Sequence, residues 1–178
     1  MKIMANRMDF GFRMHQDEYE EAALRVLRSG WYILGKEVEA FESEYAAYHG
    51  EGFSCAGVAN GLDALVLAIR AMGIGEGDEV IVQGNTYIAS VMGISINGAT
   101  PVFVEPDEHH QIDVDRIEAA ITDKTKAVMV VHLYGHICDM DKVVQICKKR
   151  GLRLVEDCAQ SHGARWKGKL AGTFGDAG

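Results

Sequence analysis

The chain has 178 residues, of which 48% are hydrophobic and 25% are charged, and its formal net charge is −8. A chain of this length can form about one domain with a substantial buried core. The negative charge argues against nucleic acid or an anionic membrane as the main partner. No apolar run approaches the ~20 residues that a membrane-spanning helix needs, and residues 1–7 lack the apolar region of a signal peptide.

The cysteines and histidines do not indicate a disulfide framework or a metal site. No two cysteines have C-x-x-C spacing, and each lies in or beside an apolar segment: Cys55, Cys138, Cys147 and Cys158. Buried free thiols are therefore expected, which is typical of a cytoplasmic protein. His132 and His136 have the spacing of a zinc-binding helix, but Gly135 and the strand-like run before it make this segment a strand end and a loop. We therefore predict no metal site.

Residues 1–50 are predicted to form a helical segment that packs on a larger domain. Apolar side chains within residues 17–29 fall on one helical face, and Ser29-Gly30 ends that helix. A second amphipathic helix follows, and we expect its inward side chains to be Val38, Phe41, Tyr45 and Tyr48. Its acidic side chains are expected to be solvated: Glu37, Glu39, Glu42 and Glu44.

From residue 51 onwards the pattern changes to alternating strands and helices. Apolar runs predict strands at residues 53–58, 79–82, 100–105, 126–132 and 152–155. Helices are predicted between them, at residues 60–72, 86–97, 113–121 and 139–149. This order predicts an α/β fold with a mostly parallel sheet and helices on both faces. Residues 172–178 show no core-forming pattern, so the domain is expected to be incomplete at its C-terminus.

Polar groups follow three of the predicted strands, where open parallel sheets place their ligand sites. Asn60 to Asp63 opens a helix whose free amides suit phosphate, although Asn60 as a plain N-cap explains the same residues. Tyr87 could stack on a planar ring or simply pack. Asp157 suits a protonated ring nitrogen, and Gln160 suits a ring oxygen. Together these groups suit the phosphate, ring nitrogen and ring oxygen of pyridoxal phosphate. The one glycine-rich run follows a helix and precedes a strand, which is the reverse of the order in a Rossmann dinucleotide site, so we reject that site.

Several collinear motifs resemble the DegT/StrS-type nucleotide-sugar aminotransferases. They are NGLDAL at 60–65, GEGDEVIV at 75–82, NTYIA at 85–89, GATPVFV at 98–104, VHLYG at 131–135 and EDCAQSHGA at 156–164. The resemblance implies the fold-type I pyridoxal-phosphate architecture, similar to aspartate aminotransferase, in a homodimer with active sites at the subunit interface. Residues 51–178 would then be part of the cofactor-binding large domain, without the C-terminal small domain.

The resemblance also implies roles for individual residues. Asp157 would pair with the pyridinium nitrogen and keep the ring an electron sink, and Gln160 would hydrogen-bond the ring hydroxyl. Tyr87 would stack on the ring, and the amides of Gly61 and Leu62 would hold the phosphate. The side chains expected near the site or the substrate are Trp31, Tyr32, Leu34, His132, Tyr134 and His162.

The chain departs from the family pattern at a few points. Leu62 stands where many members have threonine, which removes a hydroxyl contact but keeps the amide, and Cys158 stands where alanine is commoner. The Schiff-base lysine of the family lies beyond the position of Gly178, so no catalytic residue is expected within residues 1–178. Lys167 and Lys169 lie in a polar turn that, in the family, is located away from the reacting groups.

By the resemblance, the protein transfers an amino group, with glutamate as the expected donor, to a keto sugar linked to a nucleotide. The NTYIA motif, with Val104-Glu-Pro106, is similar to members that aminate a dTDP-linked 3-keto deoxysugar for polysaccharide or deoxyamino sugar synthesis. Some relatives are instead sugar 3-dehydratases in which histidine replaces the lysine, and residues 1–178 do not separate the two reactions. A third reading is a truncated, non-catalytic fragment, and we expect no transamination from residues 1–178 alone.

Overall fold

The computed structural model describes Met4 and residues 7–178, and the chain divides into two compact units, residues 1–57 and 58–178. Each unit is described by itself. The expectation that residues 1–7 hold no signal peptide concerns mainly residues 1–3 and 5–6, which lie outside the described residues. No helix in the described part of the chain is long and apolar enough to cross a membrane.

The first unit consists of helices: α1 Met8–Met14, α2 Gln16–Ser29 and α3 Lys36–His49. As predicted, α2 ends at Gly30, whose φ of 69° is the left-handed conformation common at helix C-termini. The apolar face of α2 stays open, because Tyr19 and Leu27 are 56% and 61% exposed. None of the described side chains on these helices is fully buried, so the unit has apolar surface left to pack against other parts.

Two acids of α3 are not simply solvated, contrary to the prediction for this face. Arg25 donates to both carboxylate oxygens of Glu37, at 2.8 and 3.1 Å. Glu42 Oε1 accepts the backbone N–H of Gly57 at 2.6 Å. Both partners lie 12 or more residues away in the sequence, where the charge pattern of one helix carries no information about them.

The strand predicted at residues 53–58 is wrong, because this segment has no regular secondary structure. Its apolar side chains suit a strand, but a strand also needs a neighbour to accept its backbone hydrogen bonds. The Gly57 N–H donates to the Glu42 side chain instead, and Phe53 and Val58 are each 42% exposed. Backbone pairing, which the apolar pattern does not report, decides this segment.

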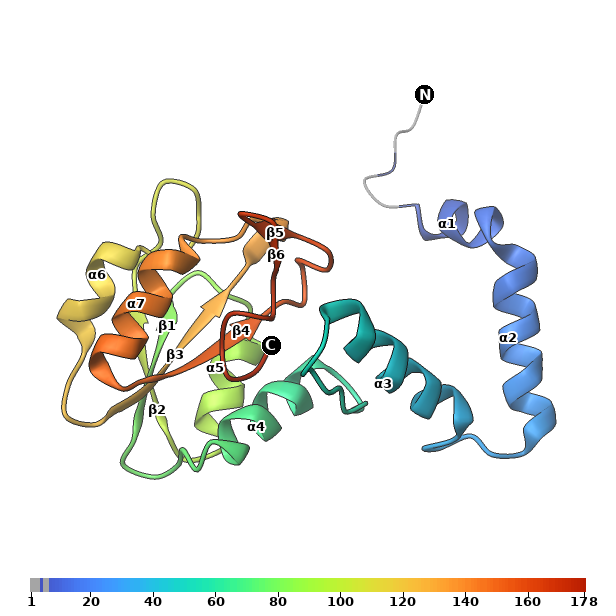
Figure 1. Cartoon of the computed structure of the whole chain (residues 1–178), viewed down its shortest axis with the longest axis horizontal. Helices are drawn as coiled ribbons and strands as arrows, with labels where there is room; N and C mark the ends of the chain where they lie inside the picture. Colours follow the sequence, from blue (N-terminus) through green and yellow to red (C-terminus); the bar gives the residue numbers. More distant parts are fainter. Residues whose placement is uncertain (1–3, 5–6) are drawn as a thin grey trace. The chain divides into compact units, whose positions relative to one another are not determined.

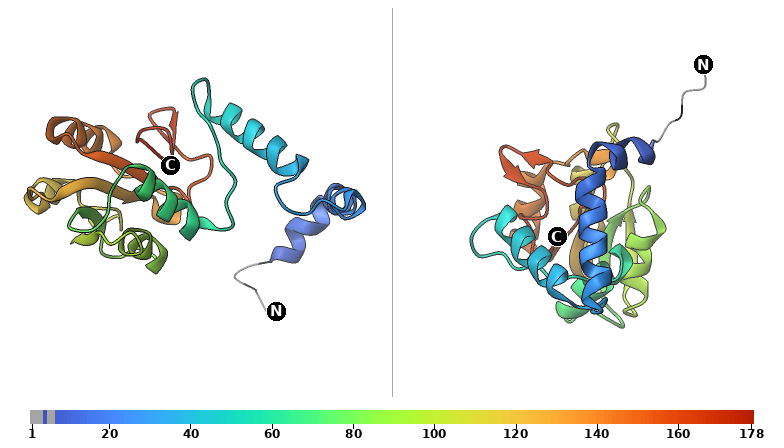
Figure 2. Two further views of the ribbon diagram at one scale, coloured as in Figure 1. Left: turned by 90° about the horizontal axis from the view of Figure 1, so that it is seen from below. Right: turned by 90° about the vertical axis from the view of Figure 1, so that its right-hand side faces the viewer.

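The second unit is built on a parallel sheet of four strands in the order β2-β1-β3-β4. The strands are β1 Glu79–Gln83, β2 Thr100–Val104, β3 Thr125–Val131 and β4 Arg153–Asp157. Helices α4 Gly61–Ala71 and α5 Ile88–Ser95 cover one face, and α6 Val114–Ala120 and α7 Met140–Arg150 cover the other (Figure 1; Figure 2). The predicted α/β fold with helices on both faces of a parallel sheet is confirmed.

Local signals set the ends of these helices as predicted. The side chains of Asn60, Asp113 and Asp139 each accept a backbone N–H from the first turn of the helix that they cap. Gly151, with φ at 66°, ends α7 in the left-handed conformation. A short 3₁₀ turn η1, Leu133–Gly135, follows β3, and a hairpin of β5 Arg165–Trp166 and β6 Lys169–Leu170 turns at the predicted place.

Strand alternation divides the interior of the second unit into two apolar clusters. Val80 and Val82 of β1 pack with α4 and α5, whereas Ile81 between them packs with α6 and α7. The same alternation in β4 sends Val155 to the α4–α5 side and Leu154 to the α6–α7 side. It follows that the two acids that end β4 face opposite sides of the sheet.

Residues 172–178 are ordered against β4, although their sequence shows no core-forming pattern. The Asp176 N–H donates to the Leu154 carbonyl at 2.8 Å, and the Glu156 N–H donates to the Ala177 carbonyl at 2.9 Å. Val155 and Ala177 form a parallel bridge. Backbone bonding, for which small residues suffice, places this segment beside the sheet.

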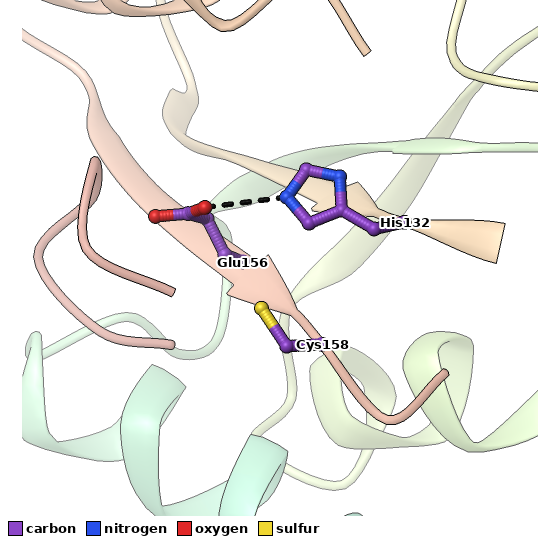
Figure 3. A group of neighbouring side chains, drawn as sticks. All are labelled: His132, Glu156 and Cys158. Atoms are coloured by element: carbon purple, nitrogen blue, oxygen red, sulfur yellow. Dashed lines mark hydrogen bonds and ion pairs between the residues drawn. The ribbon is translucent and has the colours of Figure 1, made fainter. Parts of the chain in front are cut away.

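The first acid of β4, Glu156, anchors this segment from the α6–α7 side of the sheet. Figure 3 shows its side chain with its partner His132 and the neighbouring Cys158. Its Oε1 accepts the N–H groups of Phe174 and Gly175, at 2.6 and 2.8 Å. Its Oε2 accepts the Gly172 N–H at 2.9 Å and lies 3.2 Å from His132 Nε2. A carboxylate can only accept, so Nε2 carries the proton, and Nδ1 is buried without a described partner. We name these groups the Glu156 anchor.

The hydrogen bonds of the anchor stabilise the charged form of Glu156. Burial by itself raises the pKa of this carboxyl, but the bonds from His132 and the three backbone amides outweigh burial and hold the pKa below its usual range. Cys158 lies beside the pair, and burial together with the Glu156 charge raises the pKa of its thiol to about 12. Ligand atoms of His132, Glu156 and Cys158 lie within 4.8 Å of one another. Because Glu156 already accepts four bonds and the thiol holds its proton, the cluster suits a structural role better than metal binding.

Replacing the anchor carboxylate should change how stability depends on pH. A folded-state pKa below the unfolded value of about 4.3 contributes stability above that pH, and the contribution is lost as pH falls through the folded pKa. We expect Glu156→Gln to lower the free energy of unfolding by about 1–3 kcal/mol at pH 7. The difference from wild type should shrink below about pH 4.3. Urea unfolding between neutral and acid pH measures it, with the exposed Glu76→Gln as the control. Parallel pH curves for wild type and Glu156→Gln would contradict the anchor.

Helices α4 and α5 touch at Gly93, and this contact sets how closely the two helices can pack. A Cβ atom at Gly93 would lie 2.7 Å from the Cβ of Leu65, which is fixed to the backbone of α4 and cannot move away cheaply. Gly93→Ala gains up to about 1 kcal/mol of helix propensity, but forcing the helices apart costs roughly 1–3 kcal/mol. We therefore expect a net loss of unfolding free energy in urea, whereas Ser95→Ala on the exposed side of α5 should leave it nearly unchanged. Equal stability of the two variants would refute the close contact.

Candidate functional site

A pocket of about 440 Å³ opens in the second unit, where the carboxyl ends of β3 and β4 meet the starts of α4 and α5. This is the edge at which open parallel sheets hold ligands. All the residues predicted to bind the cofactor line the pocket: Gly61, Leu62, Tyr87, Asp157 and Gln160. Apolar side chains form much of the remaining wall: Leu65, Ile88, Met92, Val131 and Leu133. The structure thus brings together groups that come from distant parts of the sequence.

The start of α4 gives the pocket a group of backbone N–H donors. The Asn60 side chain accepts the Asp63 N–H at 2.9 Å and donates to the Asp63 carboxylate at 3.1 Å. This cap leaves the amides of Gly61 and Leu62, which have no acceptor within the helix because they belong to its first turn. A Cβ atom at Gly61 would meet nothing within 4 Å, so the helix start is open. The cap and the anion-binding reading, which the sequence left as alternatives, are therefore compatible.

The second acid of β4, Asp157, faces the pocket from the α4–α5 side of the sheet. Its Oδ2 accepts the hydroxyl of Ser90 at 2.8 Å, and its Oδ1 accepts the N–H of Ala159 at 3.2 Å. Ser90 Oγ lies 2.8 Å from Thr86 Oγ1. Sequence reasoning missed Ser90 and Thr86. The available signal was their position, since both lie within one helical turn of Tyr87, at the same strand end.

Gln160 is oriented by the turn that follows β3. Its side-chain Oε1 accepts the N–H of Tyr134 at 2.7 Å, which leaves the amide NH₂ group as a donor toward the pocket side. Tyr134 has a φ of 59°, and Gly135 follows with 80°. A Cβ at Gly135 would lie 3.2 Å from the Gln160 carbonyl oxygen, so this tight turn and the Gln160 loop pack closely.

The residues predicted to lie near the substrate fall into separate places. The His132 side chain is 0% exposed and belongs to the Glu156 anchor on the face of the sheet opposite the pocket, and its role near the site stays a prediction. Tyr134 is 76% exposed on the turn beside Gln160, and His162 is exposed on the next loop. The others belong to the first unit and are exposed within it: Trp31, Tyr32 and Leu34. Their role near the substrate stays a prediction.

Comparisons with known proteins place the chain in a family. Residues 13–178 match the model of the DegT/DnrJ/EryC1/StrS aminotransferase family. A dTDP-3-amino-3,6-dideoxy-alpha-D-galactopyranose transaminase from Aneurinibacillus thermoaerophilus is 59% identical over 92% of this chain and 45% of its own length. The solved structure of DesV from S. venezuelae superimposes with a TM-score of 0.90 at 48% identity, over 93% of this chain and 45% of that one.

A further solved structure, NtdA from Bacillus subtilis, is described as carrying the bound cofactor PMP. It superimposes with a TM-score of 0.82 at 31% identity, over 89% of this chain and 36% of its own. The chain thus spans less than half the length of these relatives. The residues that match the family model, 13–178, include the parallel sheet and the pocket. On the extent of the family match, the chain belongs to the DegT/DnrJ/EryC1/StrS aminotransferase family.

Proposed function

We propose that this chain is the cofactor-binding part of a pyridoxal-phosphate-dependent aminotransferase that acts on a keto sugar linked to a nucleotide. The observation that carries the proposal is the pocket itself. It combines open helix amides, an aromatic residue, a fixed carboxylate and an oriented amide donor at one edge of the sheet. The transaminase and PMP-bound relatives support the same assignment.

The residues of the pocket fit pyridoxal phosphate. A volume of about 440 Å³ lies within the usual ~300–1,000 Å³ of small-molecule sites. The amides of Gly61 and Leu62, at a helix start with a positive dipole end, suit the phosphate. Asp157 suits a protonated ring nitrogen, and the free NH₂ of Gln160 suits the ring oxygen. Tyr87 is 70% exposed at the pocket wall, which leaves its face available for stacking on a ring.

Each residue then has a defined task. Bound pyridoxal phosphate supplies an electron sink for amino-group transfer. Asp157 keeps the proton on the ring nitrogen, and Gln160 holds the ring against rotation in its plane. The helix amides fix the phosphate end, and the apolar wall of Leu65, Met92 and other side chains excludes water from around the ring. The chain's own residues therefore bind and orient the cofactor.

The amine that reacts with the cofactor is not among the described pocket residues, since no lysine lines the pocket. Lys167 pairs with Asp141, and Lys169 lies 4.5 Å from the centre of the Phe174 ring, both on the exposed hairpin. The resemblance implies that the lysine of the complete active site comes from residues other than 1–178, and this stays a prediction. The relatives are more than twice as long as the matched segment, which leaves room for it.

The finer parts of the proposal concern the complete protein. We assign it a dTDP-linked 3-keto-6-deoxyhexose as acceptor, because the transaminase at 59% identity is named for a dTDP-3-amino-dideoxyhexose. Glutamate as the amino donor, a homodimer and a cytoplasmic location complete the proposal. The exposed apolar side chains of α2 support an interface with a second subunit.

Amino transfer by the full gene product tests the proposal directly. The protein, pyridoxal phosphate, nitrogen-labelled glutamate and the dTDP-linked 3-keto-6-deoxyhexose are incubated, and the sugar nucleotide is analysed by mass spectrometry. We expect the label in the sugar. A parallel assay offers the dTDP-linked 4-keto-6-deoxyhexose, which has a C3 hydroxyl, and a product that has lost the C3 oxygen and carries no label would identify the dehydratase reaction instead. An unchanged sugar nucleotide across dTDP-, GDP- and UDP-linked acceptors would contradict the proposal.

Neutralising Asp157 should impair the reaction far more than it impairs folding. Removing one preorganised electrostatic partner of a reacting centre typically costs about a hundred- to a thousand-fold in turnover, and we expect a loss of that size for Asp157→Asn. The matched control is Asp123→Asn, an exposed acid on the loop before β3. Turnover of Asp157→Asn within about two-fold of the control would remove the assigned role.

A further inference from the structure

Ser90 lies behind Asp157 and does not itself line the pocket. Its side chain is 1% exposed, and its hydroxyl donates to Asp157 Oδ2 at 2.8 Å across 67 residues of sequence. On its other side it meets the hydroxyl of Thr86 at 2.8 Å. Thr86 lines the pocket, so the two hydroxyls connect the Asp157 carboxylate with the pocket wall through the first turn of α5.

The direction of these hydrogen bonds follows from the number of protons. An ionised carboxylate can only accept, so the single hydroxyl proton of Ser90 must point at Asp157. Ser90 then accepts from Thr86, whose own proton is used in that bond. Both hydrogen bonds therefore run in one direction, from Thr86 to Ser90 and from Ser90 to Asp157. Each hydroxyl is polarised toward the carboxylate.

Two donors hold the carboxylate from opposite ends. Ser90 fixes Oδ2 from α5, and the Ala159 N–H fixes Oδ1 from the loop after β4. With both oxygens held, the plane of the carboxylate cannot turn without losing a hydrogen bond. Loss of the bond from Ser90 would leave a buried hydroxyl without its acceptor, which is costly. Each oxygen still has a lone pair for a donor in the pocket.

We propose that Thr86 and Ser90 form a hydroxyl relay that positions Asp157 for the ring nitrogen of the cofactor. The inference rests on the proposed function of the pocket. Ser90 is a positioning residue in this scheme, because it acts on the cofactor only through Asp157. The other explanation is that Ser90 merely satisfies a buried polar contact and supports the fold.

A ligand without the ring nitrogen separates these explanations. The probes are PMP and its deaza analogue, in which carbon replaces the ring nitrogen, and binding to the full gene product is measured by calorimetry. Wild type should prefer PMP. Ser90→Ala should weaken PMP binding about ten-fold, the usual effect of losing a hydrogen bond to a charged group, and should leave the analogue within about two-fold.

Conservative variants complete the experiment. Ser90→Thr retains the hydroxyl and should restore the preference for PMP. Thr86→Val keeps the shape of the side chain and should reduce the preference in the same direction by about two- to three-fold, because it weakens the relay at one remove. Circular dichroism of each variant verifies folding.

The outcomes distinguish the relay from the function on which it rests. If Ser90→Ala weakens the binding of both ligands equally, or of neither, the relay is overturned. The wild-type preference for PMP would still support the proposed function in that case. Wild-type protein that binds neither ligand, or binds both equally, would overturn the assignment of Asp157 to the ring nitrogen and the relay with it.

Discussion

The alternation of β4 is the constraint on which the site depends. Glu156 and Asp157 are adjacent in sequence, but the pleat of the strand turns their carboxylates to opposite faces of the sheet. Glu156 accepts four donors and fixes the segment beside the strand, whereas Asp157 accepts two and keeps capacity for a ligand. Glu156 stabilises the end of the strand, and this fixes the position of Asp157. A shift of one residue in the register of β4 would exchange the two roles.

The elements that the sequence predicted are those whose signals are local. Asn60, Asp113 and Asp139 cap helices through bonds two or three residues away. The four strands of the sheet were predicted from apolar runs within their own residues. Residues 53–58 show where this reasoning stops, because their apolar pattern suits a strand and only the absence of a described pairing neighbour decides against it. Hydrophobic periodicity and composition indicate which secondary structures a segment can adopt. The available hydrogen-bond partners decide which one it adopts.

The same distinction holds in the site. Five cofactor-binding candidates were placed together by a rule of topology, since parallel strand ends and the following helix starts meet at one edge. The VHLYG motif does not show by itself that successive residues alternate between faces of the sheet: Val131 lines the pocket, and the His132 side chain lies on the opposite face. The one signal for Ser90 was its position, three residues after Tyr87 at the same strand end. Its role becomes visible only through the hydrogen bond to Asp157, 67 residues later.

The groups aimed into the pocket are oriented by groups that stand behind them. Ser90 holds Asp157, and the Tyr134 N–H holds Gln160 through a turn with left-handed backbone at Tyr134 and Gly135. A carboxylate and an amide that are already fixed need not reorganise when charge develops on a ligand, which is where electrostatic catalysis gains most of its energy. The supporting groups use their hydrogen bonds to orient Asp157 and Gln160, so these bonds are not directed into the pocket. Specificity for the cofactor would then reside partly in residues that never touch it.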